Sequence, residues 1–214
     1  MTILALEFSS AQRSVALARD GHVLAETGEA GGRATDALGM IQRVLTEAKI
    51  EREAVEVIVV GLGPGSYTGI RAAIAVAQGW QLARGVKLLG INSVTAIAAQ
   101  AQSENILGRV NVVVDAQRGE FYLAAYDVSA ADCTEAGPLH IATLTEVQAL
   151  AATETLIGPE LTRWFSTGRE VVPRAATLAR LATGRTDFTA GENLVPVYLR
   201  ETTFVKTPQP RPAT

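Results

Sequence analysis

The sequence predicts an α/β protein built from two similar halves, each a β-meander followed by α/β units, that face one another across a cleft. Three observations carry this prediction: short apolar blocks broken by Gly, Asp and Asn, a change to helical periodicity after Gly32, and a second half that begins like the first. Apolar residues make up 48% of the 214 positions, which allows a sizeable core and disfavours a disordered chain.

The first half is expected to open on an antiparallel meander. Its three strands are predicted at 3–8, 14–18 and 22–27. The Asp20-Gly21 pair between the second and third strands is a strong hairpin signal. Beyond the meander, helices are predicted at 34–49, 69–84 and 93–102, and strands at 55–60 and 88–91. Ser66 or Thr68 is expected to cap the second helix and Ser93 the third.

The second half repeats this opening. A strand at 110–114 ends in Asp115, a polar break follows at 117–119, and a strand returns at 121–126. Further along, the pattern predicts a strand at 139–142, helices at 144–152 and 175–182, and a closing apolar run at 195–199. The chain is accordingly divided into two domains and a tail: 1–105, 106–206 and 207–214. The tail has three prolines at alternate positions and is expected to be flexible.

Charge and cysteine content limit the classes of function. The formal net charge of -3 gives no overall field that would hold a phosphate backbone, so any contact with nucleic acid would have to be shared with another protein. Cys133 is the single cysteine, which fits a reducing compartment, and no apolar run approaches the ~18 residues that span a bilayer. We therefore expect a cytoplasmic protein. Basic residues are in local excess only toward the C-terminus, most simply as a solvated face: Arg163, Arg169, Arg174, Arg180, Arg185, Arg200, Lys206 and Arg211.

Two polar turns and a Gly-rich turn form a candidate phosphate or nucleotide cleft. Hydroxyls and backbone amides can cradle an anion, while a carboxylate at a strand end can bind Mg²⁺. The alternative is that these residues only make tight turns. The Gly-rich segment 61–71 is not a Walker loop, because no lysine lies in it. The candidate residues are Glu7, Ser9, Ser10, Gly63, Gly65, Ser66, Asp115 and Arg118.

The helix predicted after this turn is small and apolar almost all round from Ile70 to Trp80. A single sheet cannot shield every face of such a helix, so we expect a second helix to cover it, either from this chain or from another polypeptide.

No catalytic residue and no metal site are predicted. His22 and His140 lie on separate predicted strands, so no His-based metal motif can be written. No nucleophile elbow is present, and Cys133 falls in a predicted polar loop without a nearby histidine.

Five segments of the sequence resemble the TsaB (YeaZ) family. They are Ile3–Glu7 with Ser14–Leu17, Gly63–Arg71, Val114–Tyr122 and Pro196–Arg200. The resemblance implies the actin-like ATPase (ASKHA, ribonuclease H-like) fold, and a role in making threonylcarbamoyladenosine beside the anticodon of tRNA. Two positions depart from the family pattern: Phe8 replaces a small polar residue, and Ala34 a histidine that follows an arginine.

The resemblance also implies that this chain does not carry out the chemistry. In the family, the sister subunit TsaD holds a metal through histidines and transfers the threonylcarbamoyl group from threonylcarbamoyl-adenylate, and the ATPase TsaE joins. This chain is expected to pair with TsaD, or with a second copy of itself, and to reach tRNA only through the complex. No tightly bound cofactor is expected, and ATP or ADP with Mg²⁺ at the partner interface stays open.

In the family, the partner surface lies on the first two helices. Carried over to this sequence, it comprises Asp36, Met40, Ile41, Val44, Ile70, Arg71, Ala73, Ile74, Ala77 and Gln78. Two other hypotheses are kept. One is a small-molecule kinase or ATPase that uses Glu7 and Asp115 around Mg-ATP, and the other is direct tRNA binding by the C-terminal basic residues.

Overall fold

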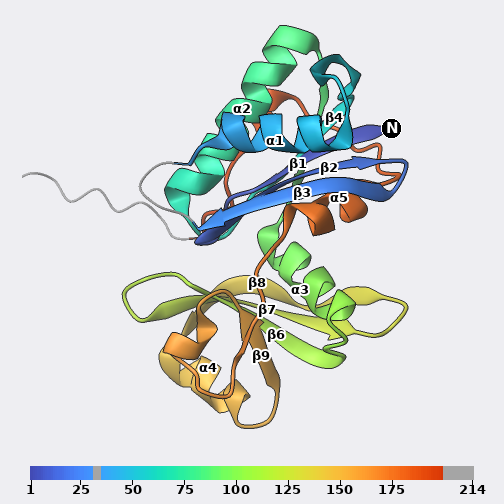
Figure 1. Ribbon diagram of the computed structural model, residues 1–214. Coiled ribbons are helices and arrows are strands. Elements are labelled where there is room, and N and C mark those ends of the chain that lie inside the picture. Colours follow the sequence, from blue (N-terminus) through green and yellow to red (C-terminus); the bar gives the residue numbers. More distant parts are fainter. Residues whose placement is uncertain (31–34, 200–214) are drawn as a thin grey trace, which may run out of the picture.

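The computed structural model describes residues 1–30 and 35–199, which form two five-stranded mixed sheets (Figure 1). The strands of the first sheet are β1 (Thr2–Glu7), β2 (Gln12–Arg19), β3 (His22–Ala30), β4 (Val57–Gly61) and β5 (Lys87–Ile91). Those of the second are β6 (Gly108–Asp115), β7 (Glu120–Val128), β8 (Cys133–Thr143), β9 (Thr155–Gly158) and β10 (Arg169–Glu170). The helices are α1 (Ala37–Ala48), α2 (Tyr67–Arg84), α3 (Ser93–Ser103), α4 (Leu144–Ala151) and α5 (Ala175–Ala182).

The two sheets have the same topology. The first has the order β3-β2-β1-β4-β5 and the second β10-β9-β6-β7-β8, so each is an antiparallel meander extended by two parallel strands. This confirms the predicted duplication. Strand β4 is buried along its whole length, as expected for a strand without alternation that is covered on both faces.

The first sheet buries both of its faces. Leu4, Leu6 and Val15 belong to the core beneath α1 and α2, whereas Ile3 and Ala5 pack on the opposite face against α5. Successive strand residues point to opposite faces, so one short strand supplies two cores.

One of the two predicted helix caps is present, and α1 has a cap that was not predicted. Asp36 caps α1, with its Oδ1 accepting a hydrogen bond from the Gly39 amide at 3.0 Å, so α1 begins at Ala37. Ser66 caps α2 as predicted, accepting from the Gly69 amide at 3.3 Å. Ser93 does not cap α3, because it is the first residue inside the helix and its hydroxyl is bound elsewhere.

The C-terminal part of the sequence-based prediction was the least accurate. The expected strand at 139–142 is the end of the longer β8, and Cys133 is the first residue of that strand rather than part of a loop. Strands β9 and β10 were not predicted, because they have four and two residues with little pattern. The run 195–199 is irregular and is anchored by a hydrogen bond of 2.9 Å from the Val197 amide to the Leu62 carbonyl. The tail 207–214 lies outside the described residues.

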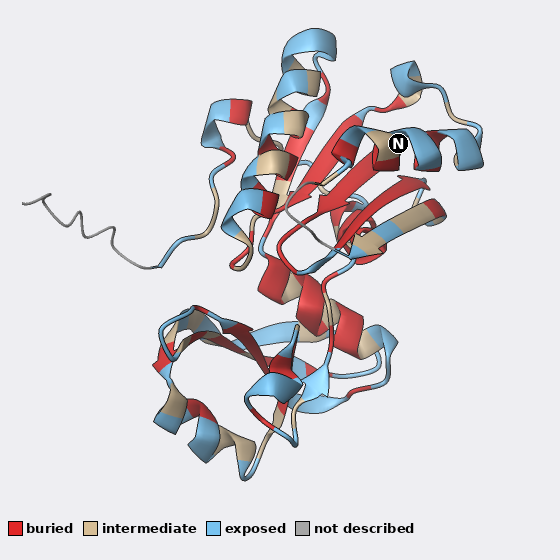
Figure 2. Ribbon diagram, turned by 60° about the vertical axis from the view of Figure 1, so that its left-hand side comes forward, coloured by how far each residue is buried: buried red, intermediate tan, exposed pale blue. Residues whose placement is uncertain are grey.

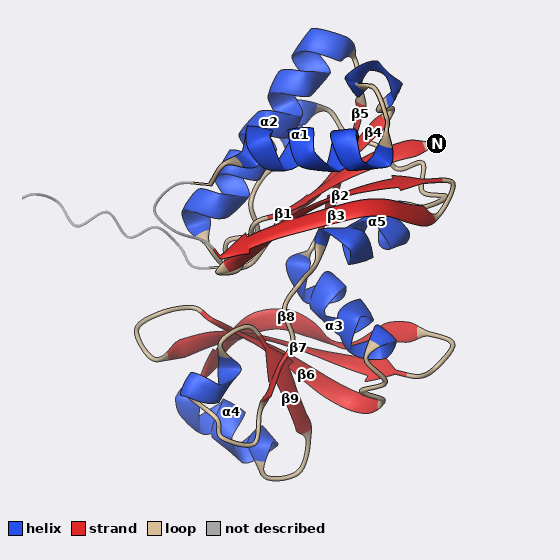
Figure 3. Ribbon diagram, in the orientation of Figure 1, coloured by secondary structure: helices blue, strands red, loops and turns tan. Residues whose placement is uncertain are grey.

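The chain does not divide into halves at residue 105. Helix α3 packs mainly into the core of the second sheet, and α5, far along the sequence, returns to cover the first sheet (Figure 3). The Thr177 hydroxyl donates to Gln100 Oε1 at 2.6 Å, and the Thr95 and Tyr126 hydroxyls lie 3.1 Å apart. The two sheets are therefore joined through a buried pair of helices from both parts of the chain.

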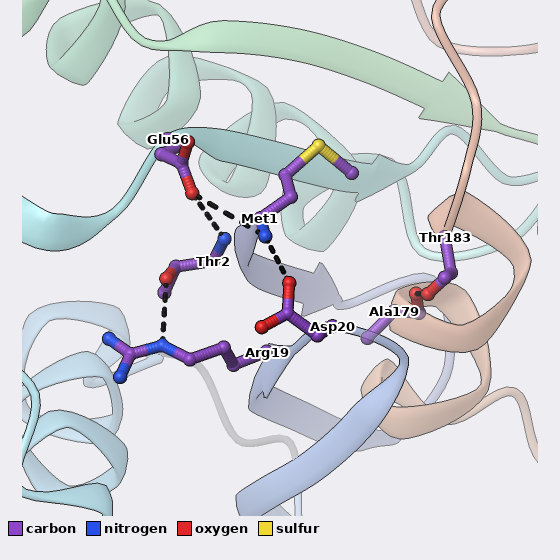
Figure 4. Close-up of polar contacts among 7 residues, drawn as sticks. All are labelled: Met1, Thr2, Arg19, Asp20, Glu56, Ala179 and Thr183. Carbon is purple, nitrogen blue, oxygen red and sulfur yellow. Dashed lines mark hydrogen bonds and ion pairs between the residues drawn. The ribbon is translucent and has the colours of Figure 1, made fainter.

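Polar contacts also close the end of the first sheet that lies away from the β1–β2 turn (Figure 4). The Met1 ammonium pairs with Asp20, the Thr2 amide donates to Glu56 Oε2 at 2.6 Å, and Arg19 Nε donates to the Thr2 hydroxyl at 3.2 Å. These contacts hold β1 to its neighbours far from the candidate cleft. No helix in the described ranges is long and apolar enough to cross a membrane.

Candidate functional site

A cavity of about 520 Å³ lies between the part of the chain built on the first sheet and the part built on the second. It is bordered by the β1–β2 turn, the start of α2, the end of β6 and the segment 159–164. Five of the eight predicted cleft residues line it: Ser9, Ser10, Gly65, Ser66 and Asp115. The structure thus brings together turns that are far apart in the sequence, as the predicted cleft requires.

Glu7 does not line this cavity, contrary to the prediction. Its side chain is fully buried, where Oε1 accepts from the Ser9 amide at 2.7 Å and Oε2 accepts from the Ser93 hydroxyl at 2.9 Å. The Gly63 amide in turn donates to Ser93 Oγ at 3.1 Å. Burial raises the pKa of Glu7 above its usual range, although these hydrogen bonds oppose the shift. Glu7 therefore links three chain segments and is not placed to bind Mg²⁺.

The Gly-rich turn is shaped by close packing. The Ser66 amide donates to the Ser9 carbonyl at 2.6 Å, which holds the turn against the segment after β1. A Cβ at Gly65 would lie 2.1 Å from the Ser9 carbonyl oxygen, and one at Gly69 would lie 2.1 Å from that of Phe8. Only glycine fits at these positions. Phe8, which departs from the family pattern, is fully buried in the core beneath α1 and α2.

The second turn is more open than the first. Asp115 is exposed and its Oδ1 accepts from the Gln117 amide at 2.6 Å. Arg118 is exposed and Gly63 is buried, and neither lines the cavity. Of the two carboxylates proposed for Mg-ATP, only Asp115 therefore reaches the cavity.

Sequence reasoning missed Arg13, a residue of β2 that lines the cavity and is only 7% exposed. Its Nε is buried, and no acceptor in the described ranges reaches it. An arginine just before a predicted strand carries no signal of such a role, because solvent-exposed arginines are common there. As for metal ligands, the described residues contain no cluster of three or more His, Cys, Asp or Glu side chains.

The predicted partner residues are mostly inside the chain, which corrects the carry-over. Seven of the ten are buried in the core between the first sheet and helices α1 and α2: Met40, Ile41, Val44, Ile70, Ala73, Ile74 and Ala77. Only Asp36 and Arg71 are exposed, and Gln78 is half-buried with its Nε2 donating to the Gly191 carbonyl at 2.8 Å. The apolar residues at helical spacing therefore pack into the core of the chain itself and are not available to a partner.

The opposite side of α2 carries a different set of residues, here named the α2 outer stripe. It consists of Thr68, Ala72, Ala75, Gly79 and Leu82, spaced three or four residues apart. Leu82 is 90% exposed, and a Cβ at Gly79 would meet nothing within 4 Å. Figure 2 shows α2 exposed along this outer side, away from the sheet. The sequence did not distinguish the two sides, because alanines lie on both of them.

The C-terminal basic residues are dispersed. Arg163 pairs with Glu160 at 2.8 Å, Arg174 pairs with Glu26, and Arg185 Nε lies 2.9 Å from Asp187. Arg200, Lys206 and Arg211 lie outside the described residues, as does Ala34. Three of the five described arginines thus have an acidic partner, and Arg169 and Arg180 are exposed to solvent, so these residues do not gather into a basic patch that would favour direct tRNA binding.

Two meander-based sheets of identical topology, facing one another across a cavity at their turns, define the actin-like ATPase (ASKHA, ribonuclease H-like) fold. Residues 34–194 match the family model described as TsaD, tRNA N6-adenosine threonylcarbamoyltransferase. The chain belongs to this family, within its TsaB (YeaZ) group.

Relatives support this assignment. The chain is 35% identical over 127 residues to the tRNA threonylcarbamoyladenosine biosynthesis protein TsaB of Escherichia coli, covering 59% of this chain and 55% of that protein. It is 29% identical over 128 residues to TsaB of Bacillus subtilis, with the same coverage. The chain thus spans about half the length of the curated relatives it matches.

Solved structures agree with the sequence relatives. YeaZ from Pseudomonas aeruginosa superposes with a TM-score of 0.80 at 29% identity, covering 92% of this chain and 99% of that one. A second Pseudomonas aeruginosa structure, described as similar to peptidase YeaZ, gives 0.79 at the same identity, covering 93% and 99%.

Proposed function

We propose that this chain is a non-catalytic partner subunit of the machinery that makes N6-threonylcarbamoyladenosine in tRNA. It binds and supports the catalytic sister TsaD, and TsaE joins the complex. The chain reaches tRNA only through this complex. No tightly bound cofactor is assigned to the chain. Family membership supports the pathway, and one structural observation, the α2 outer stripe, supports the partner role.

The stripe has the properties of a helix-packing surface. Ala72, Ala75 and Gly79 leave the backbone of α2 accessible, so a second helix can approach closely. Leu82 adds an apolar side chain that is 90% exposed. A stable interface buries about 1,000 Å² or more in total, so the contact would extend beyond the stripe, and α1 presents Leu38, 67% exposed, on the same side of the sheet. In the absence of TsaD, a second copy of the chain would occupy the same surface.

The burial of the Glu7 side chain supports a non-catalytic role for the chain. A kinase or ATPase would need a carboxylate and phosphate-binding groups around Mg-ATP, but Glu7 is buried and the Gly-rich turn has no lysine. This weighs against the enzyme hypothesis.

The test is a pull-down of the cognate TsaD with matched Ala→Arg variants. Ala75→Arg places a long charged side chain in the middle of the stripe and should weaken TsaD binding at least about tenfold while the thermal midpoint is unchanged. Ala149→Arg, at an exposed position of α4, is the control and should bind normally. Ala73→Arg is unsuitable, because Ala73 is fully buried and the variant should unfold. Unchanged capture of TsaD by Ala75→Arg would refute the proposed surface.

A further inference from the structure

The side of the cavity that belongs to the first sheet carries an arginine, Arg13, without an acidic partner. Arg13 is 7% exposed, its Nε has no acceptor among the described residues, and it takes part in none of their ion pairs. Arg13 also borders a neighbouring cavity lined by Glu26, Glu29 and Glu104, yet none of these carboxylates pairs with it. Arginine keeps its charge in proteins, and leaving its buried Nε–H donor without a partner is costly. The guanidinium therefore points to an acceptor that the chain itself does not supply.

The start of α2 offers further donors on the same wall. Ser66 Oγ accepts from the Gly69 amide, and the Ile70 amide donates to the Ser66 carbonyl. The amides of Tyr67 and Thr68, the first two helical residues, have no acceptor among the described residues, and both residues line the cavity. A helix N-terminus favours a negative group, and a guanidinium matches a carboxylate in shape and charge.

The wall formed by the second half has the opposite charge. Asp115 lines the cavity, and its Oδ1 accepts a hydrogen bond from the Gln117 amide. Its carboxylate takes part in none of the ion pairs among the described residues. Glu160 also lines the cavity and is paired with Arg163 outside it. A polyphosphate would be repelled by Asp115, whereas an ammonium group would be attracted.

We propose that this cavity binds a zwitterionic small molecule of the amino-acid class. Its carboxylate lies on Arg13 and the α2 start, and its ammonium group lies on Asp115. The volume of about 520 Å³ is within the range of ligand sites and exceeds what a single amino acid needs. This activity of the chain is separate from its partner role and does not depend on it.

Calorimetry on the purified full chain tests the proposal. The probes are a panel of proteinogenic L-amino acids, with acetate and ethylammonium as half-ligands and Mg-ATP as the polyanion. At least one amino acid should bind saturably, at least about tenfold more tightly than either half-ligand, and Mg-ATP should not displace it. The proposal is overturned if no amino acid binds, if acetate binds equally well, or if Mg-ATP competes.

Variants of Arg13 and Asp115 test whether each side of the cavity binds the amino acid. Arg13→Met and Asp115→Asn should each weaken amino-acid binding at least about tenfold, and Arg19→Met, on the same strand but at its far end, should not. Because Arg13 is unpaired, Arg13→Met should keep or raise the thermal midpoint. A large loss of stability in Arg13→Met would make the arginine structural and contradict the proposal. Unchanged binding by Asp115→Asn, an exposed and fold-neutral site, would contradict it independently.

Discussion

The ends of β1 and β6 occupy equivalent positions in the two sheets, and each carries a carboxylate that accepts the amide two residues further on. The distance from the Ser9 amide nitrogen to Glu7 Oε1 is 2.7 Å, and that from the Gln117 amide nitrogen to Asp115 Oδ1 is 2.6 Å. Their surroundings differ: Glu7 is fully buried, whereas Asp115 is exposed. The duplicated backbone has thus kept one local hydrogen bond and given it two different environments.

The difference arises from what packs on each turn. The Gly-rich turn before α2 lies against the first turn, and Ser93 from α3 completes the enclosure of Glu7. At the second turn, a Cβ at Gly119 would meet nothing within 4 Å. Equivalent topology therefore does not predict equivalent chemistry, because solvent access is set by neighbouring segments.

The largest expected difference in the free energy of unfolding is between the variants Glu7→Ala and Asp115→Ala. Removing Glu7 leaves the Ser9 amide and the Ser93 hydroxyl without their acceptor in the core and opens a cavity, so we expect a loss of about 3 kcal/mol in the free energy of unfolding. Asp115→Ala should change it by less than about 0.5 kcal/mol. Urea denaturation of both variants measures the difference, and equal effects would contradict the comparison.

A smaller difference is expected between glycines of the two turns. Gly69→Ala would place a Cβ 2.1 Å from the Phe8 carbonyl oxygen and should destabilise the fold by about 2 kcal/mol through displacement of α2. Gly119→Ala meets no neighbour, and its positive φ of 76° should cost about 1 kcal/mol. Thermal unfolding ranks the two variants, and an equal or greater loss for Gly119→Ala would contradict the tighter packing of the first turn.

The smallest effect is in the pH dependence of stability. Because the pKa of Glu7 is raised in the folded state, the folded chain holds this proton more tightly than the unfolded chain, so stability falls as pH rises above the ordinary glutamate pKa of about 4.3 toward the folded value. Glu7→Gln, which keeps an acceptor for the Ser9 amide, should flatten this fall. Thermal midpoints across acidic to neutral pH check it, and an unchanged profile in Glu7→Gln would assign the dependence to other groups.

Local patterns were enough to predict most of the fold. The Asp20-Gly21 hairpin, the unbroken β-branched run of β4 and the Ser66 cap all act within a few residues, and each is present. The boundary at 105 was wrong because α3 and α5 take their places through packing between parts of the chain that are far apart in sequence. Such contacts leave no local pattern.

The candidate site was predicted in position more than in detail. Sequence placed Ser9, Ser66 and Asp115 near one another, as the cavity shows, but burial decided the rest. Glu7 lies in the core and not in the cavity, and Arg13 was recognised only from its unpaired Nε. The same reason explains the partner surface: Ala73 and Ala75 look alike in sequence, yet one faces the sheet and the other faces outward.

Reconstituted tRNA modification tests the central claim most directly. Threonylcarbamoyladenosine would be quantified by mass spectrometry after incubating tRNA and threonylcarbamoyl-adenylate with this chain alone, with TsaD and TsaE alone, and with all three. The account predicts product only when the chain and TsaD are both present, and its loss with Ala75→Arg. Product from the chain alone, or equal product from TsaD and TsaE without it, would contradict the account.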